Sequence, residues 1–209
     1  MAEAQVGDMI KRQIIVAMTG ASGAAYGLRL IQKLTAASVQ VHVLFSDAAR
    51  IVLKQECDVI LPEVPAEALD SLAEHLQCDA GLLRCYSLKD WFSPAASGSS
   101  GIGQMVIVPC SMGTLAGIAN GISDNLIERA ADVMIKERKQ LILVPRETPL
   151  SAIHLEHMLK LSRLGVDIIP AMPGFYHRPK SLDDLIDFMV SRVLDHLNVE
   201  NLEAKRWGV

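Results

Sequence analysis

A glycine-rich turn in this sequence has the residue types that could bind a phosphate. Thr19-Gly20-Ala21-Ser22-Gly23 follows the apolar run 14–18 and precedes a helical pattern. Glycines allow the backbone to turn tightly, and the N–H groups at the start of a helix favour an anion. A plain tight turn is the alternative interpretation, because this motif alone is only moderately specific.

Hydroxyl groups stand at two further helix starts. Ser46-Asp47 follows the apolar run 39–45, and Ser111-Met112-Gly113-Thr114 follows the run 104–110. Ser46 and Ser111 are also ordinary N-cap residues, so neither is decisive alone. Three such sites at three strand ends together favour a nucleotide-like ligand, held by hydroxyls and free N–H groups.

Charged and aromatic side chains follow the next two apolar runs. Arg146-Glu147 comes after the run 141–144. The two residues form either an ion pair at the surface or a ligand site, in which Arg146 binds an anion and Glu147 donates or accepts a proton. Tyr176 lies in the segment 170–179, whose three prolines stiffen the loop and hold the ring in place.

Three more basic residues are candidates for binding a second anionic group. Arg129 and Lys136 are seven residues apart and share one face of a predicted helix. A solvated face is the alternative, and Lys136 lies near a helix C-terminus, where a cation is favoured anyway. Arg192 borders the apolar stripe of the last predicted helix, where it either extends to solvent or is held for a function.

Two other kinds of site are considered and rejected. Asp47 stands where a nicotinamide-binding reductase has its ribose-binding acid, and Tyr176 and Lys180 have the spacing of a short-chain dehydrogenase pair. That pair works only on a helix, whereas the prolines here predict a loop. His154 and His157 have no acid or cysteine partner at ligand spacing, so no metal is expected.

The elements that position these residues alternate between strand and helix. Runs that are apolar at every position, separated by helical patterns, predict an α/β fold with a parallel sheet covered on both faces and a ligand at the carboxyl ends of its strands. A short strand or an irregular piece is expected in 85–92, and a Gly/Ser loop in 93–103. Strands are expected at 14–18, 39–45, 104–110, 141–144 and 166–169, and helices at 24–34, 46–55, 62–77, 111–119, 123–139, 150–164 and from Ser181 onward.

Composition narrows the class of protein. The 209 residues are 50% hydrophobic and carry a formal net charge of −4, which predicts one domain over 1–209 and no nucleic-acid partner. No apolar run reaches the roughly 18 residues of a membrane span, and 1–9 reads as a loose tail without a secretory signal. The four cysteines form no Cys-x-x-Cys pair, which predicts reduced thiols, a cytoplasmic location and a packed core thiol at Cys110.

From Lys11 to Leu197 the chain resembles the UbiX-type flavin prenyltransferases, within the wider group of homo-oligomeric flavin-containing cysteine decarboxylases. The segments that carry the resemblance are TGASGAAYG (19–27), SD (46–47), SGSSG (97–101), PCSMGTLAGIANGISDNLIERAADVMIKER (109–138), LVPRETPLS (143–151) and PAMPGFYHRP (170–179). The resemblance implies a three-layer Rossmann/flavodoxin-like fold and a homododecamer with active sites between subunits. It implies metal-independent transfer of a dimethylallyl group from dimethylallyl monophosphate to N5 and C6 of reduced flavin mononucleotide (FMN). Prenylated FMN would then serve a separate decarboxylase, as in ubiquinone biosynthesis.

The resemblance also implies roles for individual residues. Tyr176 and Arg192 would bind the prenyl phosphate, with Arg129 and Lys136 beside them. Glu147 would be the acid/base partner of that phosphate, and Ser22 and Glu56 would lie near the reactive flavin nitrogen. Trp91 and Trp207 would wall the prenyl pocket. The implied FMN contacts are Gly20, Ala21, Ser22, Ser46, Ser111, Met112, Gly113, Thr114 and Arg146.

Two alternatives remain open from the sequence. The wider group includes decarboxylases of peptidyl-cysteine substrates, which use a histidine after the first strand and an Asn-bearing motif near the flavin. The predicted helix 24–34 has no histidine, and residues 111–114 read Ser-Met-Gly-Thr, which favours prenyl transfer. An FMN-dependent decarboxylase of an aromatic or cysteinyl acid and a non-enzymatic flavin carrier are therefore the alternatives to prenyl transfer.

Overall fold

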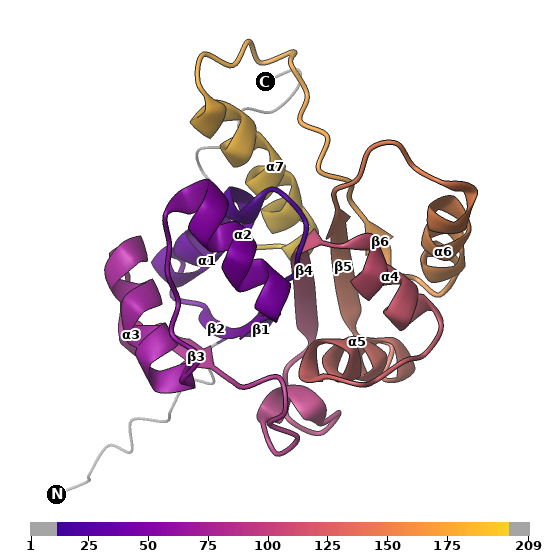
Figure 1. Ribbon diagram of the computed structural model, residues 1–209, viewed down its shortest axis with the longest axis horizontal. Coiled ribbons are helices and arrows are strands. Elements are labelled where there is room, and N and C mark those ends of the chain that lie inside the picture. Colours follow the sequence, from indigo (N-terminus) through magenta and orange to yellow (C-terminus); the bar gives the residue numbers. More distant parts are fainter. Residues whose placement is uncertain (1–11, 201–209) are drawn as a thin grey trace, which may run out of the picture.

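The computed structural model describes residues 12–200, which form three layers around one parallel sheet (Figure 1). The strand order is β3-β2-β1-β4-β5-β6, and every neighbouring pair is parallel. This confirms the expected Rossmann/flavodoxin-like fold. The strands are β1 (Gln13–Met18), β2 (Gln40–Phe45), β3 (Leu83–Cys85), β4 (Gln104–Cys110), β5 (Gln140–Pro145) and β6 (Asp167–Ile168). The helices are α1 (Ala24–Ala36), α2 (Asp47–Cys57), α3 (Pro65–Leu76), α4 (Met112–Ala119), α5 (Leu126–Lys136), α6 (Ala152–Arg163) and α7 (Leu182–Leu197), with two 3-10 turns, η1 (Ala80–Leu82) and η2 (Pro94–Ala96).

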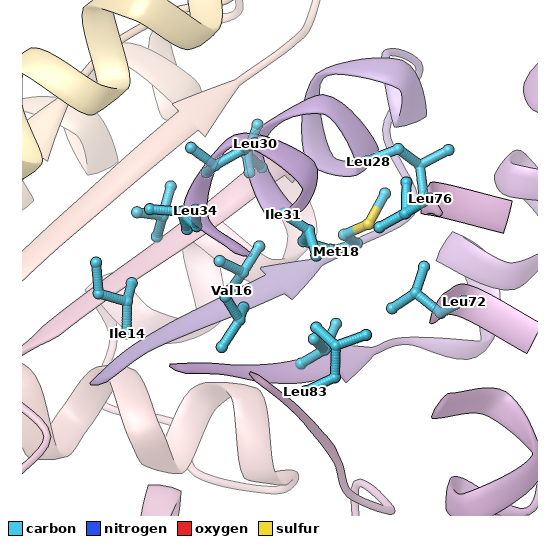
Figure 2. Packing of buried hydrophobic residues seen from close by; sticks show 14 of the residues in the cluster. Ile14, Val16, Met18, Leu28, Leu30, Ile31, Leu34, Leu72, Leu76 and Leu83 are labelled. Carbon is cyan, nitrogen blue, oxygen red and sulfur yellow. The ribbon is translucent and has the colours of Figure 1, made fainter. Parts of the chain in front are cut away.

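Alternate residues of β1 enter two separate cores. Ile14, Val16 and Met18 pack with buried residues of α1, α2, α3 and α7, and Figure 2 shows them beside leucines of α1 and α3. Ile15 and Ala17 face the other side, which is covered by α4, α5 and α6. Because both faces are buried, the central strands read as continuous apolar runs, and this is why the sequence predicts them.

The strand order reverses between β1 and β4, since β2 lies on one side of β1 and β4 on the other. Ligands of open α/β sheets bind at the carboxyl ends of strands beside such a reversal. Two glycines allow the close packing found here. A Cβ on Gly20 would lie 2.4 Å from the Cβ of Ala48, and one on Gly27 would lie 2.6 Å from the carbonyl oxygen of Val108.

Several element boundaries differ from the sequence-based expectation. The short strand expected in 85–92 is β3, which ends at Cys85, and turns follow it. The helix expected over 123–139 begins only after Asn125, because the Asn125 side chain accepts a hydrogen bond from the N–H of Glu128. It ends at Lys136, and Arg138 then adopts a left-handed conformation (φ 53°). The strand expected at 166–169 is only the two-residue edge strand β6.

Capping explains where the other helices begin. α3 starts at Pro65 instead of Pro62, with proline in the first turn, where its fixed φ suits a helix. α6 starts after Ser151, which forms a capping box with His154. The helix expected from Ser181 onward is confirmed as α7, and Ser181 forms a capping box with Asp184 at its start. Among residues 12–200, the structure contains no helix that is both long and apolar enough to span a bilayer.

Candidate active site

A buried threonine joins the two loops at the reversal point of the sheet. Thr19 is 1% exposed, and its hydroxyl donates to the carbonyl of Pro109 (2.9 Å) and accepts from the N–H of Ser111 (2.7 Å). The glycine turn after β1 is thereby fixed to the start of α4. The sequence assigns Thr19 no role of its own, and the position of its hydroxyl at the end of an apolar run was the only signal for one.

We expect the change Thr19→Val to destabilise the fold by about 1–3 kcal/mol, because the N–H of Ser111 loses its acceptor away from water. Denaturant unfolding measures this change. The control Thr19→Ser keeps the hydroxyl and should recover most of the loss. A Thr19→Val variant as stable as the parent protein would show that the threonine does not hold the two loops together.

The side chains of Ser22, Glu56 and Arg146 come together at the carboxyl edge. Glu56 Oε2 accepts hydrogen bonds from the N–H groups of Gly23 (2.8 Å) and Ala24 (3.0 Å) at the start of α1. Free N–H groups were expected at this helix start. For the N–H groups of Gly23 and Ala24 this expectation is wrong, because both donate to the Glu56 carboxylate. An anionic ligand must therefore use other donors.

The pKa of Glu56 is lowered within this cluster. Partial burial acts to raise it, but hydrogen bonds from the Ser22 side chain and from the N–H groups of Gly23 and Ala24, together with the charge of Arg146, outweigh burial. Glu56 is therefore a carboxylate throughout the neutral range, and it fixes the start of α1 beside Ser22.

This lowered pKa gives a pH-dependent prediction. A carboxyl whose pKa is lower in the folded than in the unfolded state stabilises the fold above the unfolded pKa, and the effect is lost as the pH falls through the folded pKa. Glu56→Gln should therefore unfold at a lower temperature than the parent protein at pH 7. The difference should shrink steadily below about pH 4.5, the ordinary value. Melting curves at a series of pH values test this, and a difference independent of pH would contradict it.

Two helix starts at the same edge carry hydroxyls and first-turn N–H groups, although the Ser111 hydroxyl already donates to Thr114 Oγ1 (3.1 Å). Ser46 Oγ accepts from the N–H of Ala49 (3.0 Å), and Ser111 Oγ accepts from the N–H of Thr114 (3.3 Å), so both serines are N-caps. The N–H groups of Met112 and Gly113 belong to the first turn of α4 and have no partner within the helix. A Cβ on Gly113 would meet no atom within 4 Å, so the backbone is open to a ligand there. These donors suit the phosphate of a nucleotide.

Arg146 and Glu147 follow β5 at this edge and are exposed. The backbone N–H of Arg146 donates to the carbonyl of Cys110 (3.4 Å), which places it next to the start of α4. Glu147 Oε1 accepts from the N–H of Thr148 (2.9 Å). Within a single chain, the carboxyl edge therefore collects Ser22, Glu56, Arg146 and Glu147.

Tyr176 is half exposed and packs against α7. Its ring lies edge-on to Phe188, with ring centroids 5.5 Å apart, and His177 stacks on the same Phe188 at 4.9 Å. Arg192 lies further along α7, with its side chain 53% exposed. The carbonyl of Leu197 at the end of α7 accepts from Gln104 at the start of β4, so α7 runs toward the amino edge of the sheet. Arg192 lies nearer to that end of α7 than to its start.

Arg129 and Lys136 also lie away from the carboxyl edge of their own chain. Arg129 Nε donates to the carbonyl of Ala96 (3.2 Å), in the segment that leads into β4, and Arg129 pairs with Asp132 (3.0 Å). Lys136 ends α5 close to the first residue of β5 and pairs with Glu137. Figure 1 shows α5 at the lower ends of β4 and β5, next to α4. A single chain does not test whether these cations stand beside Tyr176, and that expectation stays a prediction.

The remaining candidates are a metal site, the thiol of Cys110 and the two tryptophans. Across residues 12–200, no group of three or more His, Cys, Asp or Glu residues is placed to hold a metal. Cys110 is buried, as predicted, and burial raises the pKa of its thiol to about 12. Trp91 is 47% exposed on the segment next to α5, and Trp207 lies outside the described residues.

Known proteins match both the sequence and the fold of this chain. A family model described as "Flavoprotein" matches residues 3–194. A protein of Pseudomonas aeruginosa named flavin prenyltransferase UbiX is 53% identical over 196 residues, which are 94% of each chain. The crystal structure of AnUbiX (PadA1) in complex with FMN and dimethylallyl pyrophosphate is 40% identical, covers 95% of this chain and 98% of its own, and superposes with a TM-score of 0.85. A dodecameric FMN-dependent UbiX-like decarboxylase from Escherichia coli O157:H7 is 40% identical, covers 94% of this chain and 100% of its own, and has a TM-score of 0.84.

Proposed function

The chain belongs to the Flavoprotein family and, within it, to the UbiX-type flavin prenyltransferases, and on this basis we propose that it joins a dimethylallyl group from dimethylallyl monophosphate to N5 and C6 of reduced FMN. The observation that carries the proposal is the 53% identity, over 94% of both chains, to a relative named for this activity. The donors at the carboxyl edge add support, because they suit a flavin phosphate.

FMN is held, in this proposal, across the carboxyl ends of β1, β2 and β4. Ser46 and the segment 111–114 offer hydroxyls and first-turn N–H groups to its phosphate, and Arg146 adds a positive charge. The turn 20–22 borders the flavin ring, and Ser22 and Glu56 lie near its reactive nitrogen. Thr19 keeps the two loops at a fixed separation.

The second phosphate needs cations that one chain does not place at this edge. We propose that each site is completed by neighbouring copies, which supply Arg129, Lys136, Tyr176 and Arg192. The geometry supports this, because Arg129 and Lys136 are held on α5, away from their own carboxyl edge. A dodecamer is compatible with it, since the relative from E. coli is dodecameric.

The reaction breaks the C–O bond of the prenyl phosphate and releases inorganic phosphate as the allyl carbon bonds to N5 of the flavin, which loses its proton. A proton is then added to the prenyl double bond as its other end bonds to C6. Arg129, Lys136 and Arg192 stabilise the negative charge that develops on the departing phosphate, and Tyr176 donates a hydrogen bond to it. Preorganised charges of this kind usually make the largest single contribution to catalysis. Glu147 controls the protonation of the released phosphate, which accepts the proton lost from C6. No step requires a metal.

One anaerobic assay tests this function. Bound FMN is reduced, dimethylallyl monophosphate is added, and the molecular mass of the flavin is measured by mass spectrometry. We expect a gain of one five-carbon prenyl unit. The E. coli relative is described as a decarboxylase, so release of carbon dioxide from an added aromatic or cysteinyl acid would favour that alternative. Unchanged flavin that passes to a partner protein would favour a carrier.

The proposal extends to the fate of the product. Prenylated FMN is useful only where a decarboxylase binds it, so we propose that the chain supplies a separate decarboxylase in the cytoplasm, as in ubiquinone biosynthesis. The reduced thiols expected for Cys57, Cys78, Cys85 and Cys110 agree with that compartment, and in the structure all four are free.

A further inference from the structure

Arg29 of α1 holds two carboxylates of α7, the helix that packs beside α1 (Figure 1). Its Nη1 donates to both carboxylate oxygens of Asp187 (2.8 and 2.9 Å), and its Nη2 donates to Asp183 Oδ1 (2.7 Å). Asp183 and Asp187 are one helical turn apart, so they share one face of α7. A guanidinium is planar and its donors point in fixed directions, so one arginine on two carboxylates fixes the position and the rotation of a helix. We call these three residues the Arg29 cluster.

The cluster attaches the part of α7 that is least buried. Each fully buried residue of α7 lies at Met189 or beyond, whereas Leu182, at its first position, is exposed. Ile186 is only partly buried against the core. Asp183 and Asp187 both fall within this poorly buried stretch. The ion pairs therefore add a fixed attachment where the core packing of α7 is weakest.

The loop that carries Tyr176 rests on the same part of α7. Phe188, which follows Asp187, has the Tyr176 ring edge-on to it (5.5 Å between ring centroids) and the His177 ring stacked on it (4.9 Å). The loop packs closely there, because a Cβ on Gly174 would lie 3.0 Å from the Tyr176 ring and 3.1 Å from the Phe188 ring. Such packing leaves no free space to absorb a shift, so a displacement of Phe188 would move the Tyr176 ring as well.

We propose that Arg29 is a positioning residue for the prenyl phosphate: it holds the first turns of α7 against α1 and thereby fixes Tyr176, which donates a hydrogen bond to that phosphate. The inference rests on the proposed function, which supplies the phosphate and the role of Tyr176. Arg29 has no ligand contact in this proposal, because its guanidinium donates to α7. Its effect travels through a contiguous chain of contacts, from α1 through α7 to the segment 170–179.

Loss of these ion pairs should leave the protein folded. Pairs between partly exposed side chains contribute little to stability, and the side chains of Asp183 and Asp187 are 70% and 39% exposed. A purely structural role for Arg29 would change the melting temperature slightly and leave ligand affinity as it is. A positioning role instead weakens the binding of the prenyl phosphate and spares the binding of FMN.

The affinity for dimethylallyl monophosphate tests the inference in the variants Arg29→Gln and Asp187→Asn. Isothermal titration calorimetry is done on protein loaded with oxidised FMN, so that no prenyl transfer accompanies binding. We expect each variant to bind dimethylallyl monophosphate about tenfold more weakly than the parent protein, with the affinity for FMN changed less than about twofold. Direct electrostatic attraction predicts opposite signs instead, because loss of the Asp187 charge would strengthen the binding of an anion.

Three further variants separate positioning from a general loosening of α1. Gln32→Ala removes the hydrogen bond from Gln32 Nε2 to the carbonyl of Leu76 (3.3 Å), which joins α1 to α3 instead of α7, and it should bind as the parent protein does. Arg29→Lys keeps the charge but not the fork of donors, and it should recover part of the affinity. The double variant Arg29→Gln/Asp187→Asn should bind about as weakly as Arg29→Gln, because the second change then has no ion pair to break.

The inference is overturned if Arg29→Gln or Asp187→Asn keeps the parent affinity for dimethylallyl monophosphate. Tighter binding by Asp187→Asn, or binding by Gln32→Ala as weak as that by Arg29→Gln, would overturn it as well. Circular dichroism and melting curves check that each variant is folded at the temperature of the titration. Failure of the parent protein, loaded with FMN, to bind dimethylallyl monophosphate would overturn the proposed function instead.

Discussion

Replacing Arg129 with alanine lowers prenyl transfer by about 100- to 1,000-fold, with FMN binding changed little. The reason is the proposed role of Arg129, which is to stabilise the charge on the departing phosphate; deletion of one preorganised donor has this effect in other enzymes. FMN binding is spared because FMN is held, in the proposed site, by donors of the carboxyl edge, whereas the neighbouring copy's Arg129 meets the prenyl phosphate. Single-turnover rates under anaerobic conditions, together with flavin fluorescence titrations, measure the two effects separately.

Mixing two kinds of inactive subunit should restore part of the prenyl-transfer activity. Inactive Arg129→Ala and inactive Glu147→Gln chains, dissociated and reassembled together, form some sites with an intact Glu147 from one copy and an intact Arg129 from another. Equal mixing should restore about a quarter of the parent activity, if the copies associate at random. No recovery, with mixed assemblies present, would mean that both residues of a site come from one chain.

The change Glu147→Gln gives the second large effect. It should slow prenyl transfer at least about 100-fold, within the range that acid–base groups contribute, while the affinity for FMN changes only a few-fold. Glutamine keeps the size of the side chain and the acceptor for the N–H of Thr148, so the loop after β5 is preserved. Turnover equal to that of the parent protein would exclude a proton-handling role for Glu147.

The sheet was predictable because its strands are buried on both faces. Runs such as 104–110 are apolar at nearly every position, and only a covered parallel sheet requires this of consecutive residues. The edge strands were not predictable to the same degree. β6 has two residues and one neighbouring strand, so its burial is partial and its pattern is weak.

The candidate site was predictable where its residues follow strands directly. Ser46, Ser111 and Arg146 all lie at the carboxyl edge, as their positions after apolar runs indicate. The hydrogen bond from Gly23, at the start of α1, to Glu56 was not predictable, because it joins positions 33 residues apart in the sequence. The same is true of Thr19, which joins positions 92 apart.

Arg129 and Lys136 show a different limit. Their spacing correctly placed both on one helix, but spacing within a helix does not say which edge of the sheet the helix faces. The structure places them on α5, away from the carboxyl edge of their own chain. In the proposed site, it is a neighbouring copy that brings them to a flavin.

The most direct test is a structure of the assembled protein soaked with both FMN and dimethylallyl monophosphate. We predict FMN against Ser22 and Arg146 of one copy, with Arg129 and Lys136 of a neighbouring copy at the prenyl phosphate. A loaded structure in which those two cations face solvent or another ligand, while both phosphates lie elsewhere, would contradict the idea of a flavin site shared between copies.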